Sequence, residues 1–176
     1  MKLNGESHQL SQSEITDIFV KVLSDTYSLK KFLLSQLPKM TYKSKDMHLK
    51  MLIVNSGSYL NSEMLRMEIA MKQLNKVLTN DLSIVGDGLD FEKYLLKDID
   101  QASIYNDVKL LNHLMLLVGI EINSFRLMAV LSKHLKPKTI NELMNLNLSG
   151  AIKYQKMLLD TYNSYIANKY STRSSA

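Results

Sequence analysis

The longest apolar stretch of the chain covers residues 99–135, and its hydrophobic positions recur at the spacing of an α-helix. They form two adjacent stripes, so most of the circumference of the predicted helix is apolar. A surface helix needs only one such stripe, and this stretch is therefore predicted to lie at the centre of a helical bundle. The first stripe contains Ile104, Val108, Leu111, Met115, Val118, Ile122 and Phe125, and the second contains Leu110, Leu114, Leu117, Met128 and Leu131.

Three other stretches also show helical periodicity. The first is predicted to begin after Ser11, which forms a capping box with Glu14, and to end near residue 37 because Pro38 follows. The second is predicted from residue 44 or 45 to about residue 78. The third is predicted from Thr139, its expected cap, to about residue 167. Its expected inner positions are Ile140, Met144, Leu148, Ala151, Leu158, Tyr162 and Tyr165.

No segment alternates apolar and polar residues in the manner of a β-hairpin. The sequence therefore predicts an all-α protein, an up-down four-helix bundle with a longer crossover between its second and third helices, at about residues 79–97. Residues 79–90, which have Gly86-Asp87-Gly88 near their centre, are predicted to form a loop, and a short helical piece is predicted at 91–96. We expect a frayed segment at 1–13, a single domain at 14–168 and a disordered tail at 169–176.

The composition of the chain indicates the cellular compartment in which the protein is expected. The chain has no cysteine, so it forms neither disulfides nor thiolate sites, and a reducing cytoplasm is the simplest setting. The longest uninterrupted apolar run, residues 114–120, is far shorter than a membrane span. The first 14 residues are polar and lack the apolar segment of a signal peptide. We therefore expect a soluble cytoplasmic protein.

The net charge of +5 is unevenly distributed. From residue 133 onward there are seven basic residues and only two acidic ones, whereas the rest of the chain is balanced. Such asymmetry is compatible with a polyanionic partner. No arginine cluster or interleaved aromatic residues accompany the lysines, so a solvated helix face is the simpler interpretation, and neither nucleic acid nor membrane is the expected partner.

Two charged residues fall on predicted apolar faces. Glu121 lies four residues after Leu117 on the second stripe of the central stretch. A carboxylate at such a position needs a metal, a cation or a proton. Lys30 lies in a row with Thr26 and Leu33 on the first helix, so it points inward or lies at the edge of the core. By contrast, Glu63 and Glu68 are expected on the surface, the latter because it precedes Lys72 by four residues.

Other common sites are absent from the sequence. There is no glycine-rich phosphate loop, and none of the four histidines stands in a Glu-x-x-His pair. The 11 methionines lie at helical spacing beside leucines, where methionine usually fills a core rather than binding a soft metal.

Several motifs resemble those of the YciE/YciF ferritin-like proteins. Residues 23–28 (LSDTYS) and 36–40 (QLPKM) are similar to the LxDxYxAE and LPKM segments of the first helix of that family. Residues 121–125 (EINSF) are similar to its HYEIxxY segment, and Arg66-Met67 is similar to the RL or RI of its second helix. The resemblance covers about residues 14–165. It implies a ferritin-like bundle, often a homodimer, with a carboxylate-rich di-iron site and an association with bacterial stress responses.

The positions that the resemblance assigns to this metal site are largely occupied by other residue types. They are Lys30, Ser56, Tyr59, Val118, Glu121, Ser149 and Gly150. Of these, Glu121 alone keeps a ligand carboxylate, and an ammonium such as that of Lys30 repels a metal ion. We therefore expect no metal and no cofactor. The hypothesis is that Lys30 and Glu121 form a buried ion pair in place of a metal, with Tyr59 adding a hydrogen bond.

These observations predict a protein without catalytic residues that has lost its di-iron site and acts as an interaction or stress-associated protein, most simply as a homodimer. One alternative is a di-metal oxidase with rearranged ligands drawn from Glu63, Glu121, Glu142 and His113. The other is a polyanion binder that uses the basic fourth helix and tail.

Overall fold

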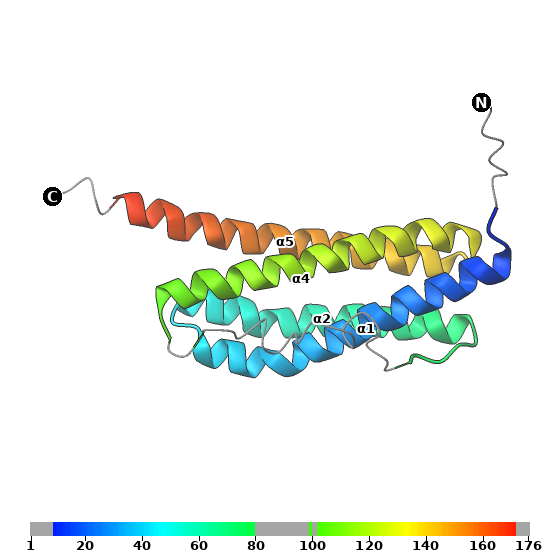
Figure 1. The fold of residues 1–176 in the computed structure, drawn as a ribbon, viewed down its shortest axis with the longest axis horizontal. Helices are drawn as coiled ribbons and strands as arrows, with labels where there is room; N and C mark the ends of the chain where they lie inside the picture. Colours follow the sequence, from blue (N-terminus) through cyan, green and yellow to red (C-terminus); the bar gives the residue numbers. More distant parts are fainter. Residues whose placement is uncertain (1–8, 80–98, 100–101, 172–176) are drawn as a thin grey trace, which may run out of the picture.

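The computed structural model describes residues 9–79, 99 and 102–171. Within these ranges it contains four long α-helices: α1 (Gln12–Lys43), α2 (Met47–Gln73), α4 (Ile104–Leu131) and α5 (Thr139–Ser171). They run side by side as an elongated bundle (Figure 1). A short 3-10 helix, η1 (Ser132–His134), follows α4. The predicted all-α four-helix bundle is therefore confirmed.

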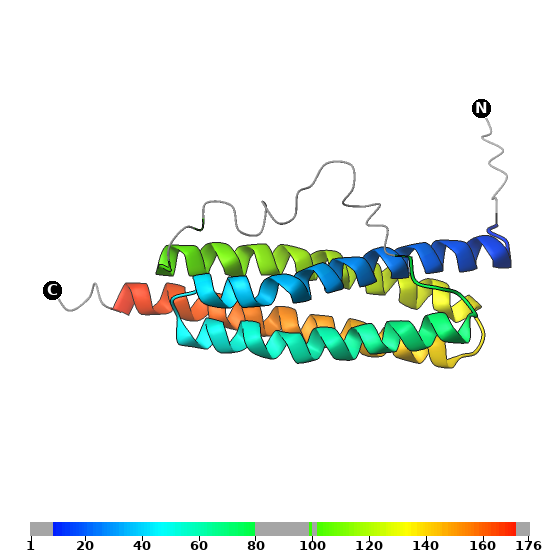
Figure 2. The ribbon, with the colours of Figure 1, turned by 90° about the horizontal axis from the view of Figure 1, so that it is seen from below.

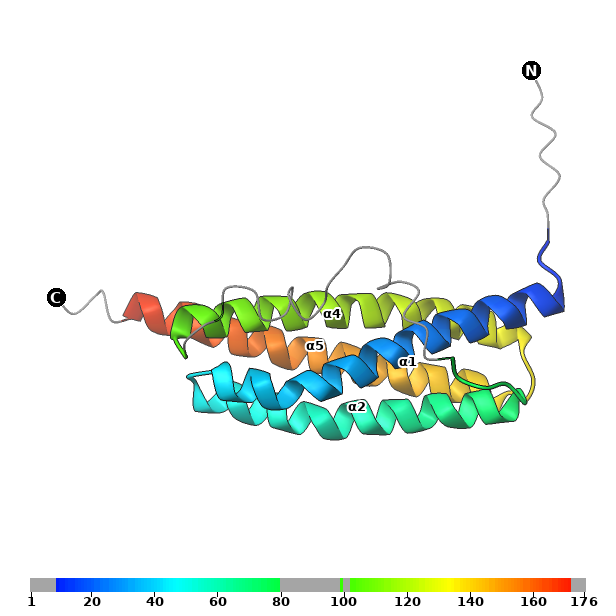
Figure 3. The ribbon, with the colours of Figure 1, turned by 60° about the horizontal axis from the view of Figure 1, so that its bottom comes forward.

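The helices form two layers. Figure 2 shows α1 and α4 in one layer and α5 and α2 in the other. Each helix packs against two neighbours, so that the cyclic order is α1, α2, α5, α4. Figure 3 shows α1 crossing obliquely over the others. The predicted loop at 79–90, the helical piece at 91–96 and most of the crossover lie outside the described residues.

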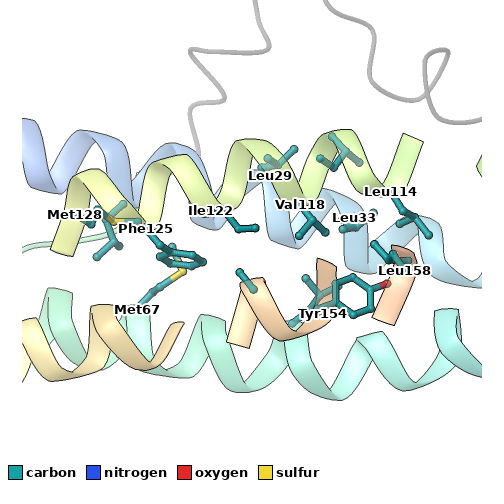
Figure 4. Close-up of a cluster of buried hydrophobic side chains, with 14 of the residues drawn as sticks. Leu29, Leu33, Met67, Leu114, Val118, Ile122, Phe125, Met128, Tyr154 and Leu158 are labelled. Atoms are coloured by element: carbon teal, nitrogen blue, oxygen red, sulfur yellow. The ribbon is translucent and has the colours of Figure 1, made fainter. Parts of the chain in front are cut away.

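The core runs along the bundle axis and is formed by all four helices. Its side chains include Leu29 and Leu33 of α1, Met67 of α2, Phe125 of α4 and Leu158 of α5, shown with their neighbours in Figure 4. The central helix α4 carries buried residues on both predicted stripes, from Leu110 to Leu131.

The segment Ile104–His134 is also long and apolar enough to span a membrane, with a mean hydropathy of 1.8. Among the described residues no other helix meets these criteria, and half of the apolar window is buried inside the bundle.

Several helix ends differ from the predictions. The capping box is present, with the Ser11 amide donating to Glu14 Oε2 at 2.7 Å. However, α1 continues past Pro38 to Lys43, so the predicted stop is wrong. Pro38 lies on the exposed face, where water can reach the carbonyl that the proline leaves without a partner, and burial of Met40 favours one further turn.

The second helix begins and ends inside its predicted limits. Asp46 caps its start by accepting from the Leu49 amide at 2.9 Å. At the other end Asn75 has a positive φ of 53°. The amides of Asn75 and Lys76 donate to the carbonyls of Lys72 and Met71, both at 3.1 Å. These bonds form a Schellman motif, which ends α2 before the predicted residue 78.

The third and fourth predicted helices also have shifted ends. The central helix begins at Ile104 after the cap Ser103, rather than at residue 99, and Ile104 itself is exposed. The last helix begins at Thr139 as predicted and runs to Ser171. The Thr139 hydroxyl donates to Gln73 Oε1 of α2 at 2.9 Å, which ties the two ends together.

Candidate functional site

Lys30 lies in the middle of the bundle with none of its surface exposed. It continues an inward row of α1 that includes Leu23, Thr26 and Leu33, all buried. The side chain therefore cannot reach solvent along the helix, as an edge lysine would. Its ammonium lies 5.1 Å from the centre of the Phe125 ring of α4, within the range of a cation–π contact.

Two carboxylates from two other helices hold this ammonium. Lys30 Nζ lies 2.6 Å from Glu63 Oε2 of α2 and 2.8 Å from Glu121 Oε2 of α4. Both glutamates are buried, at 5% and 2% exposure. The structure thus brings the hypothesised partners Lys30 and Glu121 together and adds Glu63. The prediction that Glu63 lies on the surface is wrong. We call Lys30, Glu63 and Glu121 the ion cluster.

The protonation of the cluster follows from its burial and its charges. Burial disfavours the Lys30 ammonium, but the charges of Glu121 and Glu63 outweigh this effect, so the pKa of Lys30 is raised above its ordinary value. Burial raises the pKa of Glu63; the Lys30 charge opposes this, while the charge of Glu121 adds to it. The lysine therefore stays charged at neutral pH, and Glu63 binds a proton more readily than an exposed glutamate does.

Polar groups of α2 and α5 surround the Glu63 backbone. Asn147 Nδ2 donates to the Glu63 carbonyl at 3.2 Å, and Arg66 Nε donates to Asn147 Oδ1 at 2.5 Å. The Arg66 charge also lowers the pKa of Glu63 slightly, after the larger effects of burial, Lys30 and Glu121. These bonds link the cluster region of α2 to α5.

Two buried polar atoms near the cluster have no hydrogen-bond partner. They are Glu121 Oε1 and the Tyr154 hydroxyl of α5. Tyr154 lies among apolar side chains in Figure 4. Burial raises its pKa, the nearby Ser56 hydroxyl opposes this effect, and the charges of Glu121 and Glu63 raise the pKa further, so the phenol stays neutral.

The other sequence-predicted positions lie around the cluster without adding ligands. Ser56 is buried and its hydroxyl donates to the Ile53 carbonyl at 2.5 Å. Val118 is fully buried in the core, and Ser149 is exposed. Gly150 lies against Glu63, because a Cβ at this position would be only 3.0 Å from Glu63 Oε1.

The predicted hydrogen bond from Tyr59 to the ion pair is not formed. Tyr59 is 37% exposed, and its ring lies 6.2 Å from that of Tyr154. The inner tyrosine is Tyr154, which sequence reasoning missed. Ala151 and Leu158 were predicted as inner positions, and Tyr154 lies three residues after the first and four before the second. This helical spacing places Tyr154 on the same inward face and could have predicted its burial.

The residues around Lys30 do not fit a di-metal centre. Such a centre needs several carboxylate and imidazole ligands, whereas this one has two carboxylates, each with one oxygen on the ammonium. Over the part of the chain that the structure describes, no group of three or more His, Cys, Asp or Glu residues could hold a metal. The alternative ligand set also fails to converge, because His113 precedes Glu121 by eight residues, about 12 Å along α4, and Glu142 is exposed.

Comparison with known proteins places the chain in a family. The model of the family described as "Domain of unknown function (DUF892)" matches residues 14–171, and the chain belongs to that family. The crystal structure of the E. coli stress protein YciF is similar, with a TM-score of 0.78 and 19% sequence identity over 87% of this chain and 97% of that chain. Together these matches confirm the YciE/YciF-like family predicted from the motifs. No curated protein sequence matches the chain.

Proposed function

We propose that this chain is a metal-free, non-catalytic member of its family that acts by binding rather than by chemistry. In this proposal the Lys30 ammonium occupies the position that a metal ion would need and balances the charge of Glu63 and Glu121. The observation that carries the proposal is the position of Lys30 Nζ, 2.6 and 2.8 Å from the two carboxylates. A divalent ion brought to the same oxygens would have to displace or deprotonate a buried ammonium.

The similarity to the E. coli stress protein YciF supports a stress-associated role. Because no group of His, Cys, Asp or Glu residues among the described residues could hold a metal, we infer that such a role depends on the outer surface. A cysteine-free chain also suits a reducing cytoplasm.

Polyanion binding has less support. Lys133, Lys136 and Lys138 are exposed at the turn between α4 and α5, and Lys153 and Lys156 are exposed farther along α5. The nearest members of the two groups, Lys138 and Lys153, are separated by about 22 Å of helix. The basic residues therefore do not form one continuous stripe.

Metal content tests the proposal. Protein produced in medium supplemented with iron and manganese should contain less than about 0.1 equivalent of either metal per chain, and added Mn²⁺ should leave its unfolding midpoint unchanged. A matched variant, Lys30→Glu, replaces the ammonium with a third carboxylate, and Mn²⁺ should raise its unfolding midpoint. About two equivalents of metal in the wild-type protein would contradict the proposal.

A further inference from the structure

Two methionines at the start of α2 lie outside the core. Met47 and Met51 are 66% and 58% exposed. They lie one helical turn apart, at the end of the bundle where α4 also begins (Figure 2). Methionines that do fill the core, as predicted, are Met40, Met64, Met67, Met71, Met128 and Met144. Core packing therefore does not explain why positions 47 and 51 carry methionine.

A histidine lies beside these two methionines. His48 is exposed, and within the described ranges no group forms a hydrogen bond with its ring. Met51 follows His48 by three residues and Met47 by four. Side chains at both spacings are neighbours on a helix surface, with Cβ atoms about 5–6 Å apart. Because a methionine side chain has three rotatable bonds, both sulfurs can turn toward an ion that the His48 ring also reaches.

The donor atoms of this group are two thioether sulfurs and one imidazole nitrogen. Thioether ligands select Cu(I), and imidazole also binds copper. Hard ions such as Mg²⁺ and Mn²⁺ prefer carboxylate and carbonyl oxygens, which these three side chains do not provide. The chain has no cysteine, so methionine is its only source of sulfur ligands. The chemistry of the group therefore favours a soft, singly charged ion.

The charges around the start of α2 agree with this preference. Three lysines and two aspartates lie there: Lys43, Lys45, Lys50, Asp46 and Asp107. All three lysines are at least partly exposed, so solvent and salt screen the small positive excess. A singly charged ion held by neutral ligands therefore meets little repulsion, whereas a divalent ion meets more and gains no carboxylate ligand in return.

We propose that Met47, His48 and Met51 form a surface site for one Cu(I) ion. Met51 precedes Glu63 of the ion cluster by 12 residues, about 18 Å along α2. The site is therefore separate from the ion cluster, and copper bound there leaves the interior of the bundle without metal. For this reason the inference does not depend on the proposed function, and either of the two can fail alone.

Competition with a chromogenic Cu(I) chelator, without oxygen, measures the affinity of the full chain. The wild-type protein should bind about one equivalent of Cu(I). Met51→Leu and His48→Gln each remove one ligand from an exposed position, and each should raise the dissociation constant about tenfold or more. The matched control is Met157→Leu, at a half-buried position of α5, which should leave it unchanged. A wild-type dissociation constant above about 100 μM, or a Met51→Leu variant that binds as tightly as wild type, would overturn the proposal.

Methyl NMR of the wild-type protein locates the ion directly. Ag⁺ serves as the probe because it has the charge of Cu(I), shares its preference for sulfur and does not change oxidation state in the experiment. The methyl resonances of Met47 and Met51 should shift when Ag⁺ is added. Met67 and Met71 are the internal control, because they have the same four-residue spacing on α2 but are buried, at 0% and 2% exposure. Shifts of Met67 and Met71 that equal those of Met47 and Met51, or shifts confined to other methionines, would contradict the proposed site.

Discussion

Lys30 determines the electrostatics of the interior. A buried carboxylate needs compensation, and in this bundle one ammonium compensates two carboxylates from two other helices. Such a cluster contributes little net stability compared with apolar residues of the same size, but removal of one partner is costly. The cluster therefore makes the bundle dependent on one lysine.

The raised pKa of Glu63 predicts a specific pH dependence. Because the folded state binds this proton more tightly than the unfolded state, stability should fall as the pH rises from about 4.5 through the raised pKa of Glu63. Glu63→Gln removes the titration. The stability of wild type minus that of Glu63→Gln should decrease over this range, with a slope of at most about 1.4 kcal/mol per pH unit. Urea unfolding at a series of pH values measures it, and a difference that rises with pH would contradict the assignment.

At the residue level the sequence predicted part of the site. Glu121 and Lys30 stood out because each interrupts an apolar row at helical spacing. Glu63 has the same signal, three residues after Leu60 and four before Met67, but charged residues are so rarely buried that the surface was the natural expectation. Only the packing of α2 against α1 shows that the Lys30 ammonium lies next to the Glu63 carboxylate.

At the level of the elements, the helix interiors were predicted and several ends were not. Ser11 and Glu14 form a capping box that is visible in the sequence, whereas the stop at Asn75 depends on a left-handed backbone that asparagine only favours. Pro38 was expected to end α1, but its effect depends on which face of the helix it occupies. Where these helices end depends on how each residue is placed in the folded bundle, and the local sequence does not determine that placement.

Two glycines within helices provide a matched pair of substitutions. At Gly119 of α4 nothing lies within 4 Å of an added Cβ, so Gly119→Ala should stabilise the protein by about 0.5–1 kcal/mol. At Gly150 of α5 the same Cβ would lie 3.0 Å from Glu63 Oε1. Gly150→Ala should therefore cost about 1–3 kcal/mol through overpacking. Thermal unfolding compares them, and equal effects of the two variants would show that Glu63 does not occupy this space.

Asp107 fixes the link between α1 and α2 to the start of α4. Its buried carboxylate accepts hydrogen bonds from Ser44 Oγ at 2.7 Å and from the amides of Lys45 and Asp46 at 2.9 Å each. Asp107→Ala should cost about 2–4 kcal/mol because these donors lose a charged acceptor. Asp107→Asn keeps one acceptor oxygen and should recover part of the loss. Chemical denaturation tests this, and a loss below about 0.5 kcal/mol for Asp107→Ala would contradict it.

At the level of the whole molecule, hydrophobic periodicity was sufficient to predict the fold. Four long helical patterns and two short connections leave few arrangements other than an up-down bundle, and the family match and the similarity to YciF agree with it. What periodicity could not show is which side chains meet across the bundle axis. That depends on the register between helices, and the ion cluster is a result of that register.

The unfolding free energies of three proteins test most directly whether Lys30 balances the two buried glutamates. Lys30→Met alone should lose about 3–5 kcal/mol, because two carboxylates are left buried without a cation. Lys30→Met combined with Glu63→Met and Glu121→Met removes all three charges, and its stability should return to within about 1 kcal/mol of wild type or exceed it. A combined variant no more stable than Lys30→Met, measured by urea denaturation at pH 7, would contradict this role of Lys30.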